Sequence, residues 1–380
     1  MFYEEMEARR LVIEAGHRLL ENKLIARTWG NISARIGVDE FVITPSGRGY
    51  DDLEPEDLVI VKVSDCSWEG DVKPSSEKGA HAVAYALRDN VNFIIHTHQY
   101  FASAVAAECK DVSFAPCAEY ALPGTDKLTK NVEVKVRDNP DKDTFLMARH
   151  GALILAGDME SAFAKAEEME GFAKRLVDMR VPSHDFFMKS SIDAEQVKCE
   201  LFPHVVVVRD QYIMECCQAG VKVGPYLDDF AQIIGPDMIV VDSDPKTVQR
   251  ALLGYDTRNK QRNTGGRLTD LFGSGIGGAI GTGIAGVGGL VKKPMTGALH
   301  QMGGFHPALN SMIGRNAVLV RGVGAVCAGK TQDDAEAAAM IASKNCAAAC
   351  YVRSAKPLSP IDARVQRYIY LTKYSKLKNK

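Results

Sequence analysis

The chain has 380 residues, of which 46% are hydrophobic and 25% are charged, and its formal net charge at pH 7 is −2. This composition is ordinary for a soluble globular protein with one large domain or two. The nearly balanced charge gives no electrostatic reason to expect binding to nucleic acid or to an acidic membrane surface. The nine cysteines form no CxxC pair, and their odd number favours reduced thiols over a disulfide framework. The first ten residues, MFYEEMEARR, contain no apolar signal core, so we expect a cytoplasmic protein.

Strands and helices alternate through the first 180 residues. Residues 3–22 carry apolar side chains at helical spacing, and the runs FVITPSG and LVIVKV are typical of strands. SSEKGAHAVAYALRD predicts a helix capped by Ser75 or Ser76, and NFIIHTH predicts a strand that a helix over YFASAVAAEC follows. TFLMARHGALILAG is strand-like and precedes a strong helix over MESAFAKAEEMEGFAKRL. This alternation predicts a mixed α/β domain.

The second half contains an echo of the first. TFLMARHGALILAGDMESAFAKAEE (144–168) is similar to AVLVRGVGAVCAGKTQDDAEAAAM (317–340), and an alignment with one gap puts Val323 where His150 stands. Residues 201–208 and 233–252 predict further strand–turn–helix material. We therefore expect an internal duplication with a boundary near 182–195, in which the second copy is degenerate and shortened.

One uncharged segment, FGSGIGGAIGTGIAGVGGLV (272–291), is long enough to suggest a membrane span. Glycine makes up almost half of it and lowers its hydrophobicity, so we favour a loop inserted at about 263–294. The spacing of Gly273, Gly275 and Gly278 resembles a dinucleotide-binding fingerprint, but no clear strand precedes it, and that reading lacks its required context.

Two histidines stand two residues apart at the end of the predicted strand NFIIHTH. Because side chains alternate faces along a strand, His96 and His98 should project together. His150 follows another predicted strand, and three nitrogen ligands with an open position are typical of a catalytic zinc site. The lack of paired cysteines removes a closed structural zinc site. The competing interpretation is that the HTH pair is a chance feature of the surface or core.

Polar groups also gather at the start of the predicted helix over 75–89. Glu77 either complements the helix dipole or moves a proton to and from a metal-bound substrate. Ser75 and Ser76 offer hydroxyls and backbone N–H groups at a helix N-terminus, which is an anion-binding arrangement. The turns TWGNIS (28–33) and TPSG (44–47) can add donors, although such residues are also common in ordinary turns and caps.

Five stretches, TWGNIS, TPSG, KPSSE, HTH and RHG, together resemble in order and spacing the class II aldolase/adducin family over roughly residues 5–180. The family includes fuculose-1-phosphate aldolase, ribulose-5-phosphate 4-epimerase and methylthioribulose-1-phosphate dehydratase. The resemblance implies a class II aldolase-like αβα fold around a mixed central sheet. We expect a catalytic domain at 1–185 and a degenerate aldolase-like domain at 186–380.

The resemblance also implies roles for individual residues. His96, His98 and His150 would bind a divalent metal, Zn²⁺ or alternatively Mn²⁺ or Co²⁺, and Glu77 would be the acid/base. A pocket for the substrate phosphate would be formed by Thr28, Gly30, Asn31, Thr44, Gly47, Ser75 and Ser76. The second half carries Val323 in place of a ligand, so we expect no second metal site there.

The function implied is a metal-dependent lyase that cleaves a ketose phosphate or related small sugar by a retro-aldol reaction through an enediolate. An epimerase or dehydratase acting on a sugar phosphate and a non-catalytic adducin-like scaffold remain alternatives. Family aldolases carry a tyrosine acid near the HTH motif, and here Tyr120 and the C-terminal tyrosines are the open candidates for it. The expected partners are a sugar phosphate and further copies of the chain, as a homodimer or homotetramer.

Overall fold

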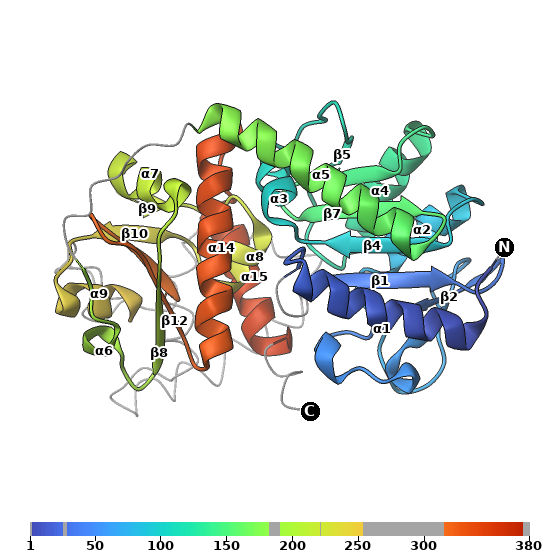
Figure 1. Ribbon diagram of the computed structural model, residues 1–380, viewed down its shortest axis with the longest axis horizontal. Coiled ribbons are helices and arrows are strands. Elements are labelled where there is room, and N and C mark those ends of the chain that lie inside the picture. Colours follow the sequence, from blue (N-terminus) through green and yellow to red (C-terminus); the bar gives the residue numbers. More distant parts are fainter. Residues whose placement is uncertain (1, 26–28, 182–190, 221, 254–314, 375–380) are drawn as a thin grey trace, which may run out of the picture.

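The computed structural model describes residues 2–25, 29–181, 191–220, 222–253 and 315–374 (Figure 1). The predicted glycine-rich insertion, most of the predicted boundary segment and Thr28 lie outside the described residues. No helix among the described ranges is long and apolar enough to cross a membrane.

The first half forms a seven-stranded sheet in the order β3-β2-β1-β4-β7-β6-β5. Only the β5–β6 pair is parallel, so the sheet is mixed, as the sequence predicts. Its strands are β1 (Gly30–Arg35), β2 (Glu40–Ile43), β3 (Val59–Lys62), β4 (Phe93–Thr97), β5 (Cys117–Ala118), β6 (Thr144–Met147) and β7 (Gly151–Ala156). The helices are α1 (Glu5–Glu21), η1 (Tyr50–Asp52), η2 (Pro55–Asp57), α2 (Lys78–Leu87), α3 (Tyr100–Ala106), α4 (Asp126–Asp138) and α5 (Met159–Arg180).

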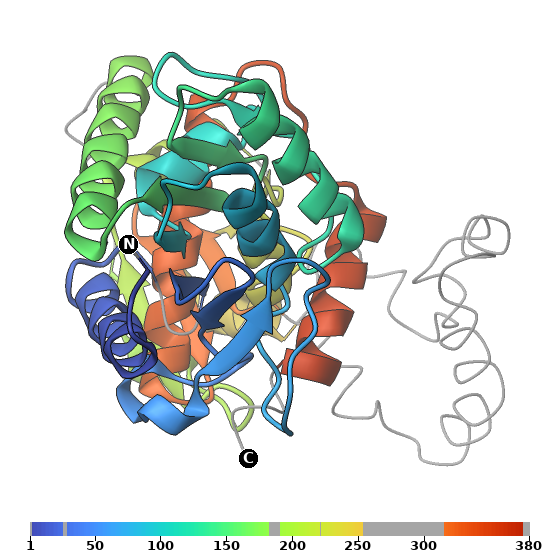
Figure 2. The same cartoon turned by 90° about the vertical axis from the view of Figure 1, so that its right-hand side faces the viewer.

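Helices cover both faces of this sheet, which gives three layers (Figure 2). Ile95 of β4 belongs to the apolar cluster formed with α1, α3 and α5, whereas its neighbour Ile94 belongs to the cluster formed with α2 and α4. The alternation of side chains along a fully buried strand therefore supplies both cores. The expected αβα arrangement of the first half is confirmed.

Two local predictions for the first half are corrected. The stretch 144–157 is a hairpin of β6 and β7, because Ala148, Arg149 and His150 form a tight turn in which His150 N–H donates to the Met147 carbonyl. The helix predicted from Ser75 begins only at Lys78, and no serine side chain caps it. Ser75 Oγ instead accepts from Glu77 N–H at 3.2 Å, which forms a turn just before the helix.

The second half forms a five-stranded sheet in the order β8-β12-β11-β10-β9. Its strands are β8 (His204–Val208), β9 (Lys222–Val223), β10 (Met238–Val241), β11 (Ala317–Val320) and β12 (Gly324–Gly329). Its helices are α6 (Ala194–Val197), α7 (Gln211–Ala219), α8 (Asp228–Ile233), α9 (Pro245–Leu252), α14 (Gln332–Tyr351), α15 (Pro360–Ile369) and the π-helical turn η3 (Tyr370–Tyr374).

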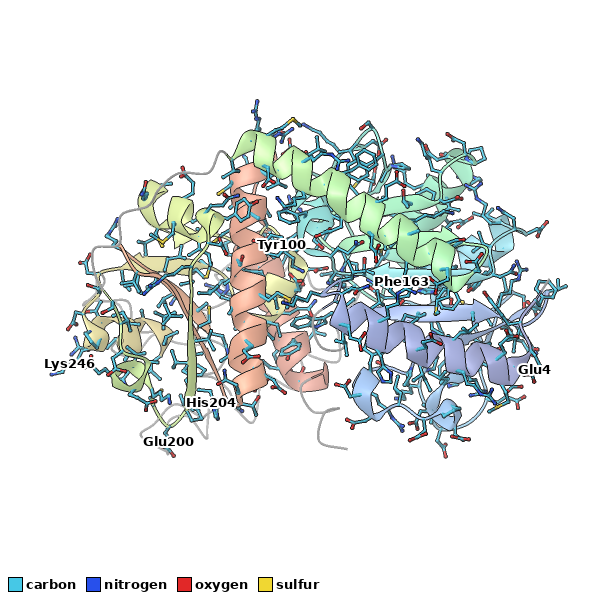
Figure 3. All side chains as sticks on the ribbon, in the orientation of Figure 1. Glu4, Tyr100, Phe163, Glu200, His204 and Lys246 are labelled. Carbon is cyan, nitrogen blue, oxygen red and sulfur yellow. The ribbon has the colours of Figure 1, made fainter. Side chains whose placement is uncertain are left out.

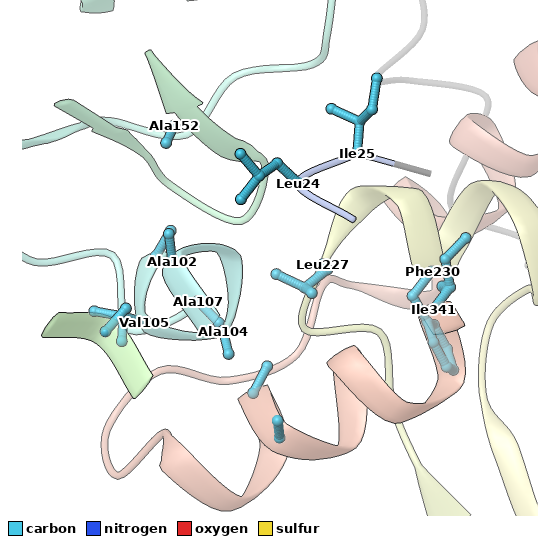
Figure 4. Packing of buried hydrophobic residues seen from close by; sticks show 14 of the residues in the cluster. Leu24, Ile25, Ala102, Ala104, Val105, Ala107, Ala152, Leu227, Phe230 and Ile341 are labelled. Atoms are coloured by element: carbon cyan, nitrogen blue, oxygen red, sulfur yellow. The ribbon is translucent and has the colours of Figure 1, made fainter. Parts of the chain in front are cut away.

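Helix α14 stands between the two sheets and joins the halves (Figure 1). Its alanine-rich sequence allows close packing, and Ile341 lies in the same apolar cluster as Ala104 of α3 and Phe230 of α8 (Figure 4). Tyr100, beside α14 in Figure 3, places its hydroxyl 2.5 Å from Ser343 Oγ. The two halves therefore share one continuous core, which brings α8 and α15 beside the first sheet.

Candidate active site

His96 lies near the end of β4 and His98 directly follows this strand. The two side chains project together, as the alternation of side chains along a strand predicts. The Nε2 atoms of the two rings are 3.2 Å apart. A glycine on each neighbouring strand lets the backbones approach here. A Cβ atom on Gly30 would lie 2.6 Å from the His96 carbonyl oxygen, and one on Gly151 would lie 2.1 Å from the Thr97 carbonyl oxygen.

His150 reaches the same place from the turn between β6 and β7. The turn requires a left-handed residue, and Arg149 occupies that position with φ of +63°. Its N–H donates to the Ala106 carbonyl, and its carbonyl accepts from Asp228 N–H at 2.9 Å. Contacts from both halves of the molecule thus hold the strained turn that presents His150.

The three imidazoles form a buried group that is able to bind a divalent metal. One nitrogen from each ring lies within 4.8 Å of the others. Nδ1 of His96 must carry a proton, since it donates to the Ala152 carbonyl at 2.9 Å, and Nδ1 of His150 faces Asp228 at 2.5 Å. The Nε2 atoms are left for the centre, where those of His96 and His150 also lie close to Glu77. The donor set therefore suits the metal that the sequence predicts.

Glu77 lies against the triad. Its Oε1 is 2.8 Å from His150 Nε2, and its Oε2 is 3.2 Å from His96 Nε2. As the residue just before α2, Glu77 also stands at the positive end of this helix. Its position is therefore compatible both with the helix-dipole interpretation and with a role in proton transfer at the triad.

A chain of buried side chains holds Glu77 in place, and sequence reasoning missed most of it. Asn31 donates its amide to Glu77 Oε2 at 3.0 Å and accepts from His81 Nε2 at 2.5 Å. His81 Nδ1 then accepts from Ser33 Oγ at 2.7 Å, which accepts from the Tyr85 hydroxyl at 2.8 Å. Each hydrogen bond in this series donates toward the Glu77 carboxylate, so the series favours an ionised Glu77.

The electrostatics of the site favour a positive charge beside Glu77. Burial alone would raise the pKa of Glu77, but the imidazoles of His150 and His96 hold it well below its ordinary value. Burial alone would lower the pKa of His150, but Asp228 and Glu77 raise it well above the ordinary value. Burial and the nearby charge of His150 lower the pKa of His98 to about 4, so its ring is neutral near pH 7 and ready to act as a ligand.

A pocket opens beside the triad and is walled by both halves. His98, His150 and Glu77 lie on it. The first half also contributes Trp29, Gly30, Asn31, Pro45, Ser46, Gly47, Ser75, Ser76, Leu122 and Pro123. The second half contributes Gln232 of α8, Gln366 and Ile369 of α15, and Tyr370. No lysine or arginine is among these lining residues, so neutral hydroxyl, amide, indole and backbone N–H groups are the donors they offer to an anion.

Two predicted phosphate contacts have other roles in the structure. Thr44 is buried in the wall, where its Oγ1 accepts from Ile32 N–H at 3.3 Å, and it is not among the lining residues. Asn31 lines the pocket, but both ends of its amide are engaged by Glu77 and His81. Gly47 lines the pocket with a positive φ of 78°, which suits a glycine in the TPSG turn.

The two sets of candidate tyrosines differ in position. Tyr120 does not line the pocket, and its hydroxyl accepts from Gln366 at 2.8 Å. Burial raises its pKa, with a further contribution from Asp228. Tyr370 lines the pocket, so of the two it is the tyrosine placed to meet a bound molecule.

Sequence reasoning also missed three charged residues of the second half that lie behind the triad. They are Asp228 and Asp229, at the start of α8, and Lys344 of α14, and all three are buried. An adjacent pair of acids before an apolar segment looks like an ordinary helix start. The available sequence signal for this buried charged group was Lys344, a lysine within the alanine-rich run of α14.

Residues 10–177 match the family model described as the class II aldolase and adducin N-terminal domain. A 5-deoxy-D-ribulose 1-phosphate aldolase from Bacillus thuringiensis serovar kurstaki is 32% identical over 174 residues, which cover 43% of this chain and 80% of that protein. An L-fuculose phosphate aldolase from Methanococcus maripaludis is 31% identical over 173 residues, which cover 43% of this chain and 92% of that protein.

Among solved structures, an L-fuculose 1-phosphate aldolase is 28% identical, has a TM-score of 0.42, and is matched over 46% of this chain and 86% of that chain. Asp228, Asp229, Lys344 and the α15 wall of the pocket lie outside residues 10–177, the range of the family match.

Proposed function

Because the chain belongs to the class II aldolase and adducin family, we propose that it is a divalent-metal-dependent aldolase that cleaves a ketose 1-phosphate. Relatives of the chain are aldolases, and the chain is an enzyme of this carbon–carbon lyase class. One observation carries the proposal: three buried imidazoles and an oriented carboxylate meet beside a pocket lined with serines and glycines.

The residues of the chain divide the work of a retro-aldol cleavage. A divalent cation held by His96, His98 and His150 would supply positive charge to the ketose oxygens as the C3–C4 bond breaks. Ser76, Gly47 and their neighbours bind the phosphate through hydroxyl and backbone N–H groups and so orient the substrate. Glu77, fixed by Asn31, donates a proton to C3 after the C3–C4 bond breaks and removes it in the reverse reaction.

Product analysis tests the reaction. The chain, stripped with a chelator and reloaded with Zn²⁺, Mn²⁺ or Co²⁺, should release dihydroxyacetone phosphate from a five- or six-carbon ketose 1-phosphate. Inversion of one carbon with no fragmentation would make it an epimerase, and loss of water would make it a dehydratase. Less than about a tenth of an equivalent of metal after gentle purification would favour the adducin-like scaffold.

Two substitutions separate the metal from the proton transfer. His98→Ala should lose metal and turnover together, because two imidazoles remain where three are needed. Glu77→Gln should keep the metal, measured by elemental analysis, and lose turnover. Full activity of Glu77→Gln would contradict the acid/base assignment.

We also propose that the second half is a shortened copy of the first. The neighbouring strands β4-β7-β6-β5 and β8-β12-β11-β10 share one pattern of pairing, antiparallel, antiparallel, parallel, and this pattern supports the proposal. The two hairpin turns also agree, since Arg149 and Gly322 have φ of +63° and +67° and each precedes His150 or Val323. On this proposal the second half acts as a built-in neighbour, and the chain forms a homodimer in place of a tetramer. A monomer in light scattering would contradict the dimer.

A further inference from the structure

Two adjacent carboxylates of α8 stand behind the histidine triad, on the side away from the pocket. Asp228 Oδ2 lies 2.5 Å from His150 Nδ1, and Asp229 Oδ2 lies 3.6 Å from His98 Nδ1. The exposed fractions of these residues are 0% and 1%, so water does not screen either charge. Each carboxylate faces the nitrogen that its histidine does not offer to the centre.

Packing alone does not explain Asp228. A buried carboxylate destabilises a fold unless a cation or enough donors compensate it. The ion pair that Asp228 makes within the described residues is with His150, and its Oδ1 has no hydrogen-bond partner there. Asp229 differs, because Lys344 lies against it and also donates to the His98 carbonyl at 3.2 Å.

The arrangement is rigid, so the carboxylates are held where they can act. The side chain of Asn345, the residue after Lys344, accepts from Tyr226 N–H at 2.8 Å and from Leu227 N–H at 3.2 Å. Its amide donates to the Gly224 carbonyl at 3.0 Å. Helix α14 thus clamps the segment that leads into Asp228 and Asp229.

Histidines that bind a metal commonly donate their second ring N–H to a carboxylate, which fixes the ring and makes the ligating nitrogen more basic. We propose that Asp228 and Asp229 are positioning residues for the metal site, supplied by a part of the chain outside the matched family domain. This inference rests on the proposed function, because it requires a divalent cation at the triad. The second half would then complete the metal centre as well as the pocket.

Metal affinity in the full-length chain tests the proposal without reference to turnover. Zinc dissociation constants of the wild type and Asp228→Asn are measured by competition with a chromophoric chelator, and Co²⁺ loading gives the visible spectrum of the site. We expect zinc affinity to fall about 10- to 100-fold in Asp228→Asn and the Co²⁺ bands to shift. The metal-free variant should also lose some stability, because Asp228→Asn removes one partner of the buried pair with His150.

Asp237→Asn is the matched control. Asp237 is also in the second half and pairs with Arg315 at 2.7 Å, but it is not part of the triad's surroundings. Its zinc affinity should equal that of the wild type. Zinc affinity of Asp228→Asn within about threefold of the wild type would overturn the proposal. Weaker zinc binding with an unchanged Co²⁺ spectrum would also overturn it, because a loss of fold stability alone predicts that result.

A second variant covers Asp229 and guards against a folding defect in the first. Asp229→Asn combined with Lys344→Gln removes both charges of the buried pair, so neither is left uncompensated. We expect weaker zinc binding here too, and wild-type affinity in both variants would contradict the role of this pair. If the wild type itself binds no zinc, manganese or cobalt, the proposed function fails, and the inference falls with it.

Discussion

At the scale of single residues, the hydrogen-bond partners of each polar side chain indicate its role in the site. Glu77 accepts from the Asn31 amide, and Asn31 accepts from His81, so both ends of this amide have a partner that holds it toward Glu77. Spacing in the sequence could identify these residues as polar and close to a turn. It could not assign them, because their hydrogen bonds run to side chains 46 and 50 positions away.

The structure therefore predicts that Asn31→Ala affects the chemical step more than substrate binding. Removing the donor to Glu77 takes away a hydrogen bond to a charged group, worth about 1.5–3 kcal/mol, which corresponds to about a 10- to 100-fold loss in kcat. Ser76→Ala, at the proposed phosphate contact, serves as the comparison and should mainly raise KM. Steady-state kinetics on both variants decides, and an Asn31→Ala variant with raised KM and normal kcat would restore its role as a phosphate ligand.

Tyr370 gives a second prediction at this scale. As the candidate tyrosine that lines the pocket, Tyr370 should assist removal of the proton from the C4 hydroxyl that becomes the aldehyde, whereas Tyr120 should not. Tyr370→Phe should lower kcat by about 100-fold or more, and Tyr120→Phe should leave kcat nearly unchanged. The reverse order of effects in the same assay would show that the assignment is wrong.

At the scale of secondary-structure elements, most of the predicted helices and strands of the first half are correct in type. Periodicity found α1, α5 and the strands β2, β3 and β4, because each has one regular apolar pattern. The 144–157 stretch was harder, since all but one of the residues of β6 and β7 are buried and the turn between them has no glycine at its left-handed position. Sequence rules expect a glycine at such a position, so the turn at Arg149 could not be recognised from the sequence.

Helix α14 carries the element-scale prediction, because Asn345 satisfies three backbone groups at once. Asn345→Ala would leave them buried without partners, and unsatisfied groups cost about 1–3 kcal/mol each. We expect the free energy of unfolding to fall by about 2–4 kcal/mol in urea titrations. Gln332→Ala, at the exposed start of the same helix, should change it by less than about 0.5 kcal/mol, and an equal loss in both variants would contradict the clamp.

At the scale of the whole molecule, the junction between the halves includes a pH-sensitive contact. Glu108, just after α3, accepts from Ser354 Oγ at 2.6 Å and from Arg353 N–H at 3.0 Å. Burial alone would raise its pKa, but these hydrogen bonds lower it from its ordinary 4.5 to about 2. A lowered pKa means that this contact stabilises the fold above pH about 4.5 and is lost as the pH falls toward 2.

Glu108→Gln should accordingly be less stable than the wild type at pH 7 by about 1–2 kcal/mol, because it loses hydrogen bonds to a charged acceptor. Urea titrations at pH 7, 4 and 3 should show the difference shrinking as the pH decreases. A difference that stays constant over this range would mean that the carboxylate charge is not what stabilises the junction.

The sequence could predict the triad and Glu77 of the first half but not the site residues of the second half. His96, His98, His150 and Glu77 stand in short recognisable stretches of the first half, and the structure brings them together. Asp228, Lys344 and Gln366 reach the same region from the second half, where the sequence marks Lys344 alone, as a lysine within an alanine-rich run. Their roles depend on how α14 packs α8 and α15 against the first sheet, which is a property of the assembled core.

The pocket wall contributed by α15 is separate from the metal ligands. Gln366 and Ile369 lie on that one helix, while the triad and Glu77 belong to other elements. A combinatorial library randomised at these two positions would therefore reshape what the pocket accepts and leave every metal ligand intact. Exchanging these residues of α15 should therefore direct the protein toward substrates with other carbon skeletons.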